Sequence, residues 1–262
     1  MNRIDVKFRQ LKKNRQKALI IFITAGYPSL DATYKLILEF SRIGVDIIEL
    51  GVPFSDPIAD GPVIQKASQV ALNKKVNLID ILNLVRRARK KTDIPICLMT
   101  YYNPVFCFGE RRFVKMAAAS GVDGLLVPDL PPEEAGVLLG LARKSDLDII
   151  FFISPTTTPK RIKSIARVSK GFVYYISLTG ITGIRKNLPQ DLVSNIRSLK
   201  KNISRPICVG FGISTPGQVK QIFRIADGAI IGSAVVKKIK DNLKKRSLIK
   251  TVSKFVYRLR HV

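Results

Sequence analysis

The sequence has 262 residues, 46% of them hydrophobic, which is enough to form the core of one barrel-sized domain. No apolar run is long enough to span a membrane, and the charged segment 1–16 has no signal-peptide core, so we expect a cytoplasmic protein. The formal net charge of +26 would suit nucleic acid or an anionic membrane. However, the cations are spread along the chain and no nucleic-acid module is recognisable, so we expect neither partner.

Short hydrophobic runs recur along the chain and predict parallel strands covered by helices. They lie at 18–24, 45–50, 94–100, 124–128, 147–153, 172–177, 206–211 and 228–232. Amphipathic segments between them predict helices at 30–43, 63–72, 78–89, 110–119, 135–144, 159–168, 189–200 and 216–224. Eight such units without a linker predict an α/β fold, a (β/α)8 TIM barrel that forms a single domain over residues 1–262. An open doubly wound sheet is the alternative.

The tail at 237–262 is basic and amphipathic. Its apolar residues fall near helical spacing, which predicts an outer helix of the barrel that packs this stripe on the core. A helix lying on a membrane surface is the alternative.

The stretch from Glu49 to Gln65 follows the second predicted strand. It contains three carboxylates (Glu49, Asp56 and Asp60). Its three prolines exclude a helix and stiffen the loop, and its two glycines allow turns that other residues resist. An acid on a strand end and a second acid on a stiff loop suit acid/base chemistry on a substrate bound between them. Asp residues in such loops also commonly cap backbone N–H groups, and the residues alone leave both interpretations open.

Sites in such barrels lie at the C-terminal ends of the strands. The sixth to eighth ends are rich in residues that allow close backbone approach or donate a hydroxyl: Gly180, Gly183, Gly212, Gly232 and Ser233. A short helix after Gly232 would direct its N–H groups at an anion, so these strand ends predict a phosphate site. Glycines that serve barrel turns are the alternative.

Other catalytic chemistries have little support in the sequence. His261 is the only histidine and is one residue from the end, which argues against a histidine triad or a His-ligated metal. The three cysteines form no C-x-x-C pair. We therefore expect an acid/base enzyme that acts on a phosphorylated substrate without a metal or a cofactor in this chain.

The segment Glu-Leu-Gly-Val-Pro-Phe-Ser-Asp-Pro-Ile-Ala-Asp-Gly-Pro-Val-Ile-Gln resembles the signature of the tryptophan synthase alpha chain family. Further matches follow in order, among them Phe-Ile-Thr-Ala-Gly-Tyr-Pro at 22–28 and Val-Pro-Asp-Leu-Pro-Pro-Glu-Glu at 127–134. Others lie at 99–104, 154–159, 209–212 and 231–234. The resemblance covers nearly the whole chain.

The resemblance implies a phosphate-binding barrel that cleaves indole-3-glycerol phosphate to indole and glyceraldehyde 3-phosphate by a retro-aldol reaction. Glu49 would protonate the indole ring carbon and help to deprotonate the glycerol hydroxyl. Asp60 would accept the indole N–H and stabilise the developing positive charge. A Glu at an apolar strand end should have a raised pKa, while Asp60 must stay ionised.

The resemblance also assigns binding residues. The indole would be held by Phe22, Leu126, Ile153, Tyr174 and Phe211, and the phosphate by Gly183, Gly212, Gly232 and Ser233. The loop after Ser177, with Thr182, would close as a lid. The family works as an α2β2 heterotetramer, in which the beta chain carries pyridoxal phosphate and receives the indole for L-tryptophan synthesis. The Asp56–Asp60 loop and the loop after Ser177 would lie at that junction.

Two other functions compete with this assignment. An indole-3-glycerol phosphate synthase would need catalytic lysines at early strand ends, where this chain has Thr24, Glu49 and Thr100. A non-catalytic barrel acting as a partner or allosteric subunit is the second alternative, which the acid pair disfavours. One departure from the family is Lys74-Lys75, where relatives usually have a glycine after the helix.

Overall fold

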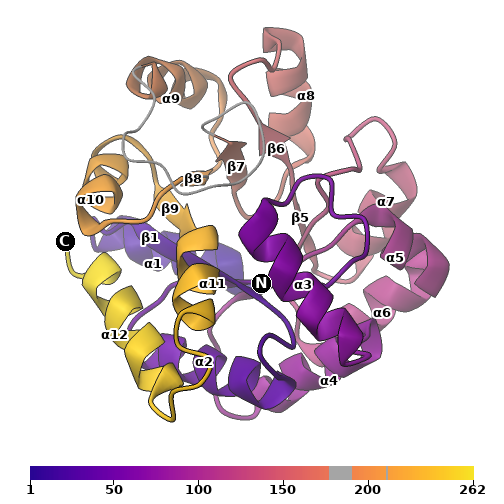
Figure 1. The fold of residues 1–262 in the computed structure, drawn as a ribbon. Helices are drawn as coiled ribbons and strands as arrows, with labels where there is room; N and C mark the ends of the chain where they lie inside the picture. The colour runs from indigo at the N-terminus through magenta and orange to yellow at the C-terminus, as the bar shows by residue number, and fades with distance from the viewer. Residues whose placement is uncertain (177–190, 211) are drawn as a thin grey trace.

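The computed structural model describes residues 1–176, 191–210 and 212–262. Parallel strands form a barrel, and helices surround it as a ring (Figure 1). The strands are β1 (Ala18–Thr24), β2 (Ile47–Gly51), β3 (Ile96–Met99), β4 (Gly124–Leu126), β5 (Asp148–Ile150), β6 (Phe152–Ile153), β7 (Val173–Ile176), β8 (Ile207–Gly210) and β9 (Gly228–Ile231). The helices are α1 (Arg3–Lys13), α2 (Leu30–Arg42), α3 (Pro62–Asn73), α4 (Leu78–Arg89), α5 (Tyr102–Phe108), α6 (Glu110–Ser120), α7 (Gly136–Lys144), α8 (Pro159–Val168), α9 (Leu192–Asn202), α10 (Pro216–Ile225), α11 (Ser233–Lys240) and α12 (Leu248–Arg260).

The sheet closes on itself through one short segment of chain. The strand order is β5-β4-β3-β2-β1-β9-β8-β7-β6, and β5 and β6 are successive parts of the predicted strand 147–153. The first part pairs with β4 and the second with β7. The N–H of Tyr174 also donates to the carbonyl of Phe151, which lies between the two parts (3.0 Å). This closure confirms the barrel and excludes the open sheet.

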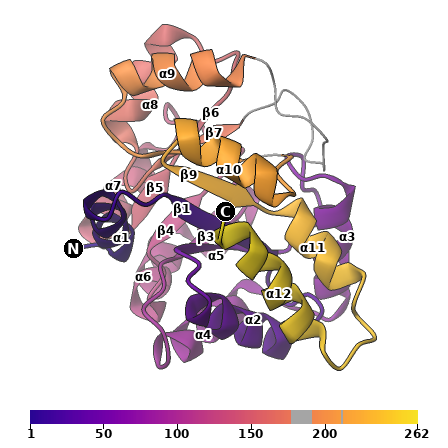
Figure 2. The same ribbon diagram turned by 90° about the vertical axis from the view of Figure 1, so that its left-hand side faces the viewer.

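The first helix, α1, was not predicted, because its sequence is dominated by charged residues. It nevertheless buries Ile4, Phe8 and Leu11. These side chains pack with the apolar residues inside the barrel, and the ring of Phe8 lies 5.9 Å from the ring of Phe172. In Figure 2, α1 covers the left-hand end of the barrel, while α3 and α11 lie toward the other end. The helix α1 therefore seals the end at which the strands begin.

The basic tail packs on the barrel, as predicted for an outer helix. The helix α12 buries Leu248, Val252, Val256 and Leu259 and contacts α2, α10 and α11. Within the described ranges, no helix combines the length and the apolar character needed to cross a membrane.

Two buried acids at the sealed end are bound to cations. Asp123 accepts hydrogen bonds from Arg89 (2.6 Å), Arg3 (3.0 Å) and the N–H of Ile96 (2.8 Å). Asp46 accepts from the N–H of Leu19 (2.8 Å) and lies 3.5 Å from the guanidinium of Arg260. Both carboxylates therefore hold elements together.

Candidate active site

Glu49 lies in the middle of β2, in register with Phe22 of β1 and Cys97 of β3. Strand alternation directs its side chain into the barrel, where it is 1% exposed. Its Oε1 atom has no hydrogen-bond partner among the described residues, in contrast to Asp46 and Asp123. A buried carboxyl group without a cation costs stability, which is typical of a functional group rather than of a structural one.

Asp60 is held by the loop that follows β2. Its Oδ2 atom accepts a hydrogen bond from the hydroxyl of Tyr101 (3.1 Å), and this hydroxyl also accepts from the N–H of Ala59 (3.0 Å). The rings of Phe54 and Tyr101 are in contact, with centroids 5.3 Å apart. Tyr101 therefore fixes the loop at two points, and the Oδ1 atom of Asp60 is left without a partner among the described residues.

The two acids differ in proton affinity. Burial raises the pKa of Glu49 to about 8. Burial also raises the pKa of Asp60, to about 6, and the hydrogen bond from Tyr101 opposes this rise. Near neutral pH Glu49 is therefore protonated and Asp60 is ionised, which is the division of roles expected for an acid and an electrostatic stabiliser.

Two aromatic rings lie against glycines of neighbouring strands inside the barrel. A Cβ atom on Gly51 would meet the ring of Phe22 at 2.5 Å, and one on Gly210 would meet the hydroxyl of Tyr174 at 2.2 Å. Burial raises the pKa of Tyr174, and the charges of Glu49 and Asp60 raise it further. The Tyr174 side chain is therefore close to both acids. Both rings occupy space that is free only because Gly51 and Gly210 have no Cβ atom.

Of the expected indole-binding residues, Leu126 belongs to the interior cluster with Tyr174, but Ile153 does not. Ile153 belongs to the larger hydrophobic cluster, which also contains Phe22. Side chains alternate along a strand, so the adjacent residue Phe152 faces the interior instead. Its ring lies 5.0 Å from that of Tyr174. Ile153 stays a prediction, and Phe152 is a further candidate for the wall.

The expected phosphate residues Gly232 and Ser233 lie at the start of α11, with Gly232 as its N-cap. The first N–H groups of a helix have no partner within the helix, and they attract anions. Gly212 has φ +80°, a conformation that favours glycine. Three further expected residues, Thr182, Gly183 and Phe211, lie outside the described residues.

The sequence pointed to Thr24 as a strand-end residue without a role. It is 1% exposed and its hydroxyl has no hydrogen-bond partner in the described part of the chain. Tyr101 was also expected at a strand end without a role, because nothing in the sequence reveals that it reaches across to the loop of Asp60. Across the described residues, no group of three or more His, Cys, Asp or Glu side chains is arranged to hold a metal ion.

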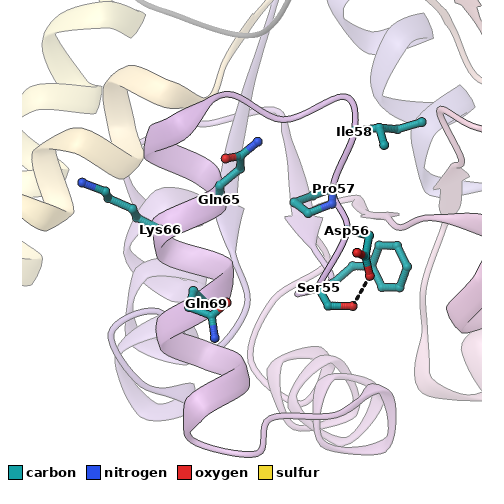
Figure 3. Close-up of a pocket in the computed structure, with 8 residues that line it drawn as sticks. Ser55, Asp56, Pro57, Ile58, Gln65, Lys66 and Gln69 are labelled. Carbon is teal, nitrogen blue, oxygen red and sulfur yellow. Dashed lines mark hydrogen bonds between the residues drawn. The ribbon is translucent and has the colours of Figure 1, made fainter.

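A hollow of about 530 Å³ lies outside the barrel, between the loop 54–58 and α3. Figure 3 shows Gln65, Lys66 and Gln69 on the helix and Ser55, Asp56, Pro57 and Ile58 on the loop. Ile58 points away from the helix and is 75% exposed. The loop that carries Asp60 thus faces the barrel with one side and the surface with the other.

Comparison with known proteins agrees with this geometry. The profile of the family "Tryptophan synthase alpha chain" matches residues 8–260. The chain belongs to the tryptophan synthase alpha chain family. The tryptophan synthase alpha chain of Caldanaerobacter subterraneus subsp. tengcongensis is 46% identical over 262 residues, which is all of both chains. That of Geotalea daltonii is 49% identical over 237 residues, or 90% of each chain.

Solved structures of tryptophan synthase alpha chains have the same fold. Tryptophan synthase subunit alpha from Legionella pneumophila superimposes with a TM-score of 0.92 at 36% identity, over 99% of this chain and 97% of the other. A chain of the tryptophan synthase complex from Pyrococcus furiosus gives a TM-score of 0.86 at 36% identity, over 94% and 98%.

Proposed function

We propose that this chain is the alpha subunit of a tryptophan synthase and cleaves indole-3-glycerol phosphate to indole and glyceraldehyde 3-phosphate. The observation that carries the proposal is Glu49, a buried carboxyl group whose Oε1 atom has no hydrogen-bond partner among the described residues and whose pKa is about 8. In this family and at this position, such a group can exchange a proton near neutrality.

Glu49 begins the reaction protonated and donates its proton to the ring carbon of indole that carries the glycerol chain. The ring then bears a positive charge, shared by its nitrogen, and the ionised Asp60 accepts the ring N–H and stabilises this charge. The resulting carboxylate of Glu49 accepts the proton of the adjacent glycerol hydroxyl. As the carbon–carbon bond breaks, the carbon that carries this hydroxyl becomes the aldehyde. The electrons of the broken bond restore the neutral indole ring. One proton is given and one is recovered, so no cofactor is needed in this chain.

The remaining residues bind the substrate. An apolar wall for the ring is supplied by Phe22, Leu126, Phe152, Ile153 and Tyr174. The phosphate is bound by Gly212, Gly232 and Ser233. The phosphate holds the substrate at the mouth of the barrel while the ring reaches the acids.

We further propose a tryptophan synthase beta chain with bound pyridoxal phosphate as the partner, in an α2β2 complex. Two apolar side chains are strongly exposed near the candidate site: Ile58 (75%) on the Asp60 loop and Phe106 (65%) on α5. Tyr101 links the two regions, because its hydroxyl donates to Asp60 on the loop of Ile58 and its backbone immediately precedes α5, which carries Phe106. A partner that covers Ile58 and Phe106 would act directly on the loop that positions Asp60.

The test is indole release from indole-3-glycerol phosphate by the purified chain, with and without an added beta chain. We expect slow cleavage alone and faster cleavage with the partner. The Ile58→Asp variant should lose most of the stimulation, because it places a charge in the covered surface. Absence of cleavage in both conditions would contradict the reaction and favour a non-catalytic partner subunit.

A further inference from the structure

Charge is unevenly distributed along this chain. From Lys160 to the end, Asp191, Asp227 and Asp241 are the only acidic residues, three of the 19 in the sequence, whereas about half of the 45 Lys and Arg residues lie there. This part of the chain forms α8 to α12, in which α8 contacts α9, α9 contacts α10, and α12 contacts both α10 and α11 (Figure 1). One side of the barrel is therefore strongly basic and attracts anions.

This basic side contains a pocket of about 500 Å³ at the sealed end of the barrel, which we call the basal pocket. Three segments meet there: the residues before β1, the second half of α10 and the end of α12. The lining residues used below are Arg15, Lys17, Lys220, Phe223, Arg224 and Arg260. Figures 1 and 2 both show the C-terminal end of the chain beside α10. The pocket lies at the end of the barrel where strands begin, and Glu49 and Ser233 face the other end.

Two of the cations form the framework of the basal pocket. Lys17 donates to Asp227 (3.3 Å), and Arg260 donates to the backbone carbonyl of Lys17 (3.0 Å) and lies 3.5 Å from Asp46. These contacts join α12 to the start of β1 and β9. The position of the pocket is therefore fixed by paired groups.

The other three cations of the pocket have no acidic partner among the described residues. Arg15, Lys220 and Arg224 form no ion pair with any residue that the structure describes. Arg15 has φ +54°, which a residue with a side chain rarely adopts, so its backbone is strained where a glycine would fit better. Three uncompensated cations in one hollow repel one another, and a shared anion would relieve this repulsion.

We propose that the basal pocket binds a compact multivalent anion of the polyphosphate class through Arg15, Lys220 and Arg224. Arginine forms paired hydrogen bonds with phosphate oxygens, and two arginines with one lysine suit two or more linked phosphates. The volume is in the range of small-ligand sites. The half-buried ring of Phe223 gives the pocket an apolar wall, on which the base of a nucleotide could stack. This inference is independent of the proposed catalytic function.

The test is calorimetric titration of the full chain with orthophosphate, pyrophosphate and tripolyphosphate. Glycerol 3-phosphate is present at saturation, to occupy the candidate phosphate site at Gly232 and Ser233. We expect one tripolyphosphate per chain and an affinity that rises with the number of phosphates. The triple variant Arg15→Gln, Lys220→Gln, Arg224→Gln should bind at least about tenfold more weakly.

A matched control separates the pocket from the general charge. The triple variant Arg167→Gln, Arg197→Gln, Lys201→Gln removes the same charge from exposed positions of α8 and α9. It should bind tripolyphosphate as the wild type does. An equal loss in both variants would overturn the proposal, as would no binding or full displacement by glycerol 3-phosphate.

A further arm identifies the source of the phosphates. If ATP binds more tightly than tripolyphosphate and Phe223→Leu removes the difference, the ligand is a nucleotide. Equal affinities assign the site to the phosphate chain alone.

Discussion

Glu49 and Asp148 are both buried carboxyl groups with an oxygen atom that has no partner among the described residues, but Glu49 lies in the middle of β2 and Asp148 is the first residue of β5. Burial raises the pKa of Glu49 to about 8, and burial together with the charges of Asp5 and Asp146 raises the pKa of Asp148 to about 7. Only Glu49 points toward the candidate site. Substitutions at these two positions can therefore distinguish the effect of losing a catalytic group from the effect of removing a buried carboxyl group.

Replacing Glu49 by Gln should stabilise the protein as the pH rises. The folded protein binds the Glu49 proton more tightly than the unfolded chain does. The stability that this carboxyl group contributes is therefore complete below its ordinary pKa of 4.5 and is lost as the pH rises through about 8. Gln does not titrate, so the difference in the free energy of unfolding should grow by about 1.4 kcal/mol per pH unit within that window. Calorimetric melting of both proteins at several pH values measures it.

The same substitution should lower kcat by about a hundredfold or more, with little change in KM, because the lost proton transfer belongs to the transition state. Asp148→Asn is the control: it should also gain stability with rising pH but keep its kcat. A Glu49→Gln variant with wild-type turnover would refute the acid/base role.

Tyr101→Phe should impair the reaction mainly at acidic pH. The Tyr101 hydroxyl hydrogen bond lowers the pKa of Asp60, so its removal should move the acidic limb of kcat/KM to higher pH. The expected loss is several-fold near pH 6 and smaller near pH 8. The pH–rate profile is the measurement. Tyr102→Phe, in which the lost hydroxyl contacts Glu110 rather than Asp60, should leave the profile unchanged.

For single residues, the sequence predicted which residues belong to the candidate site better than it predicted where their side chains point. Glu49 and Asp60 stand out because a strand end and a proline-rich loop limit where their side chains can go. The choice between Phe152 and Ile153 depends on the register of one short strand, and a shift of one residue reverses the inside and outside of a strand. The contact between Tyr101 and Asp60 spans 41 positions, which no local pattern encodes.

The end of helix α3 has a lysine in a backbone conformation that favours glycine. This residue, Lys75, is the second of the Lys74-Lys75 pair; it follows α3 with φ +58°, and its side chain is exposed. Lys75→Gly should relieve this backbone strain and raise the free energy of unfolding by about 0.5–1 kcal/mol, which corresponds to a melting temperature about 1–4 °C higher.

Lys74→Gly is the matched control, because Lys74 has φ −89° and gains nothing from glycine. It should leave stability unchanged or lower it. Equal effects of the two substitutions would show that loss of charge, rather than backbone strain, is responsible.

The elements that the sequence predicted are those with long apolar runs. The strands of the barrel and most of its outer helices fall where expected, because each carries a continuous or periodic hydrophobic signal. The helices α1 and α5 were not predicted. In α1 the buried residues are separated by charged residues, so no apolar run is visible. The helix α5 has only seven residues and begins shortly after β3. Their positions depend on the barrel that they complete, so the local sequence does not specify them.

For the molecule as a whole, the net charge of +26 should accelerate capture of the phosphorylated substrate. We expect kcat/KM to fall as salt is added, because screening shortens the range of attraction. The kcat at saturating substrate should change little, since bound substrate no longer needs to be attracted. Steady-state kinetics over a series of potassium chloride concentrations test this; a kcat/KM that is independent of salt would mean that the charge does not guide the substrate.

The pairing of β1 with β9 has a consequence for how the protein is made. Ala18 lies opposite Gly228, so one edge of β1 waits for a partner that the ribosome adds more than two hundred residues later. At ordinary rates of translation this interval is on the order of ten seconds or more. During that time the nascent chain carries an apolar strand, Ala-Leu-Ile-Ile-Phe-Ile-Thr, with an open edge of the kind that pairs with other chains. Completion of the barrel is thus a post-translational event, and the growing polypeptide needs protection from its neighbours on the polysome until β9 has emerged.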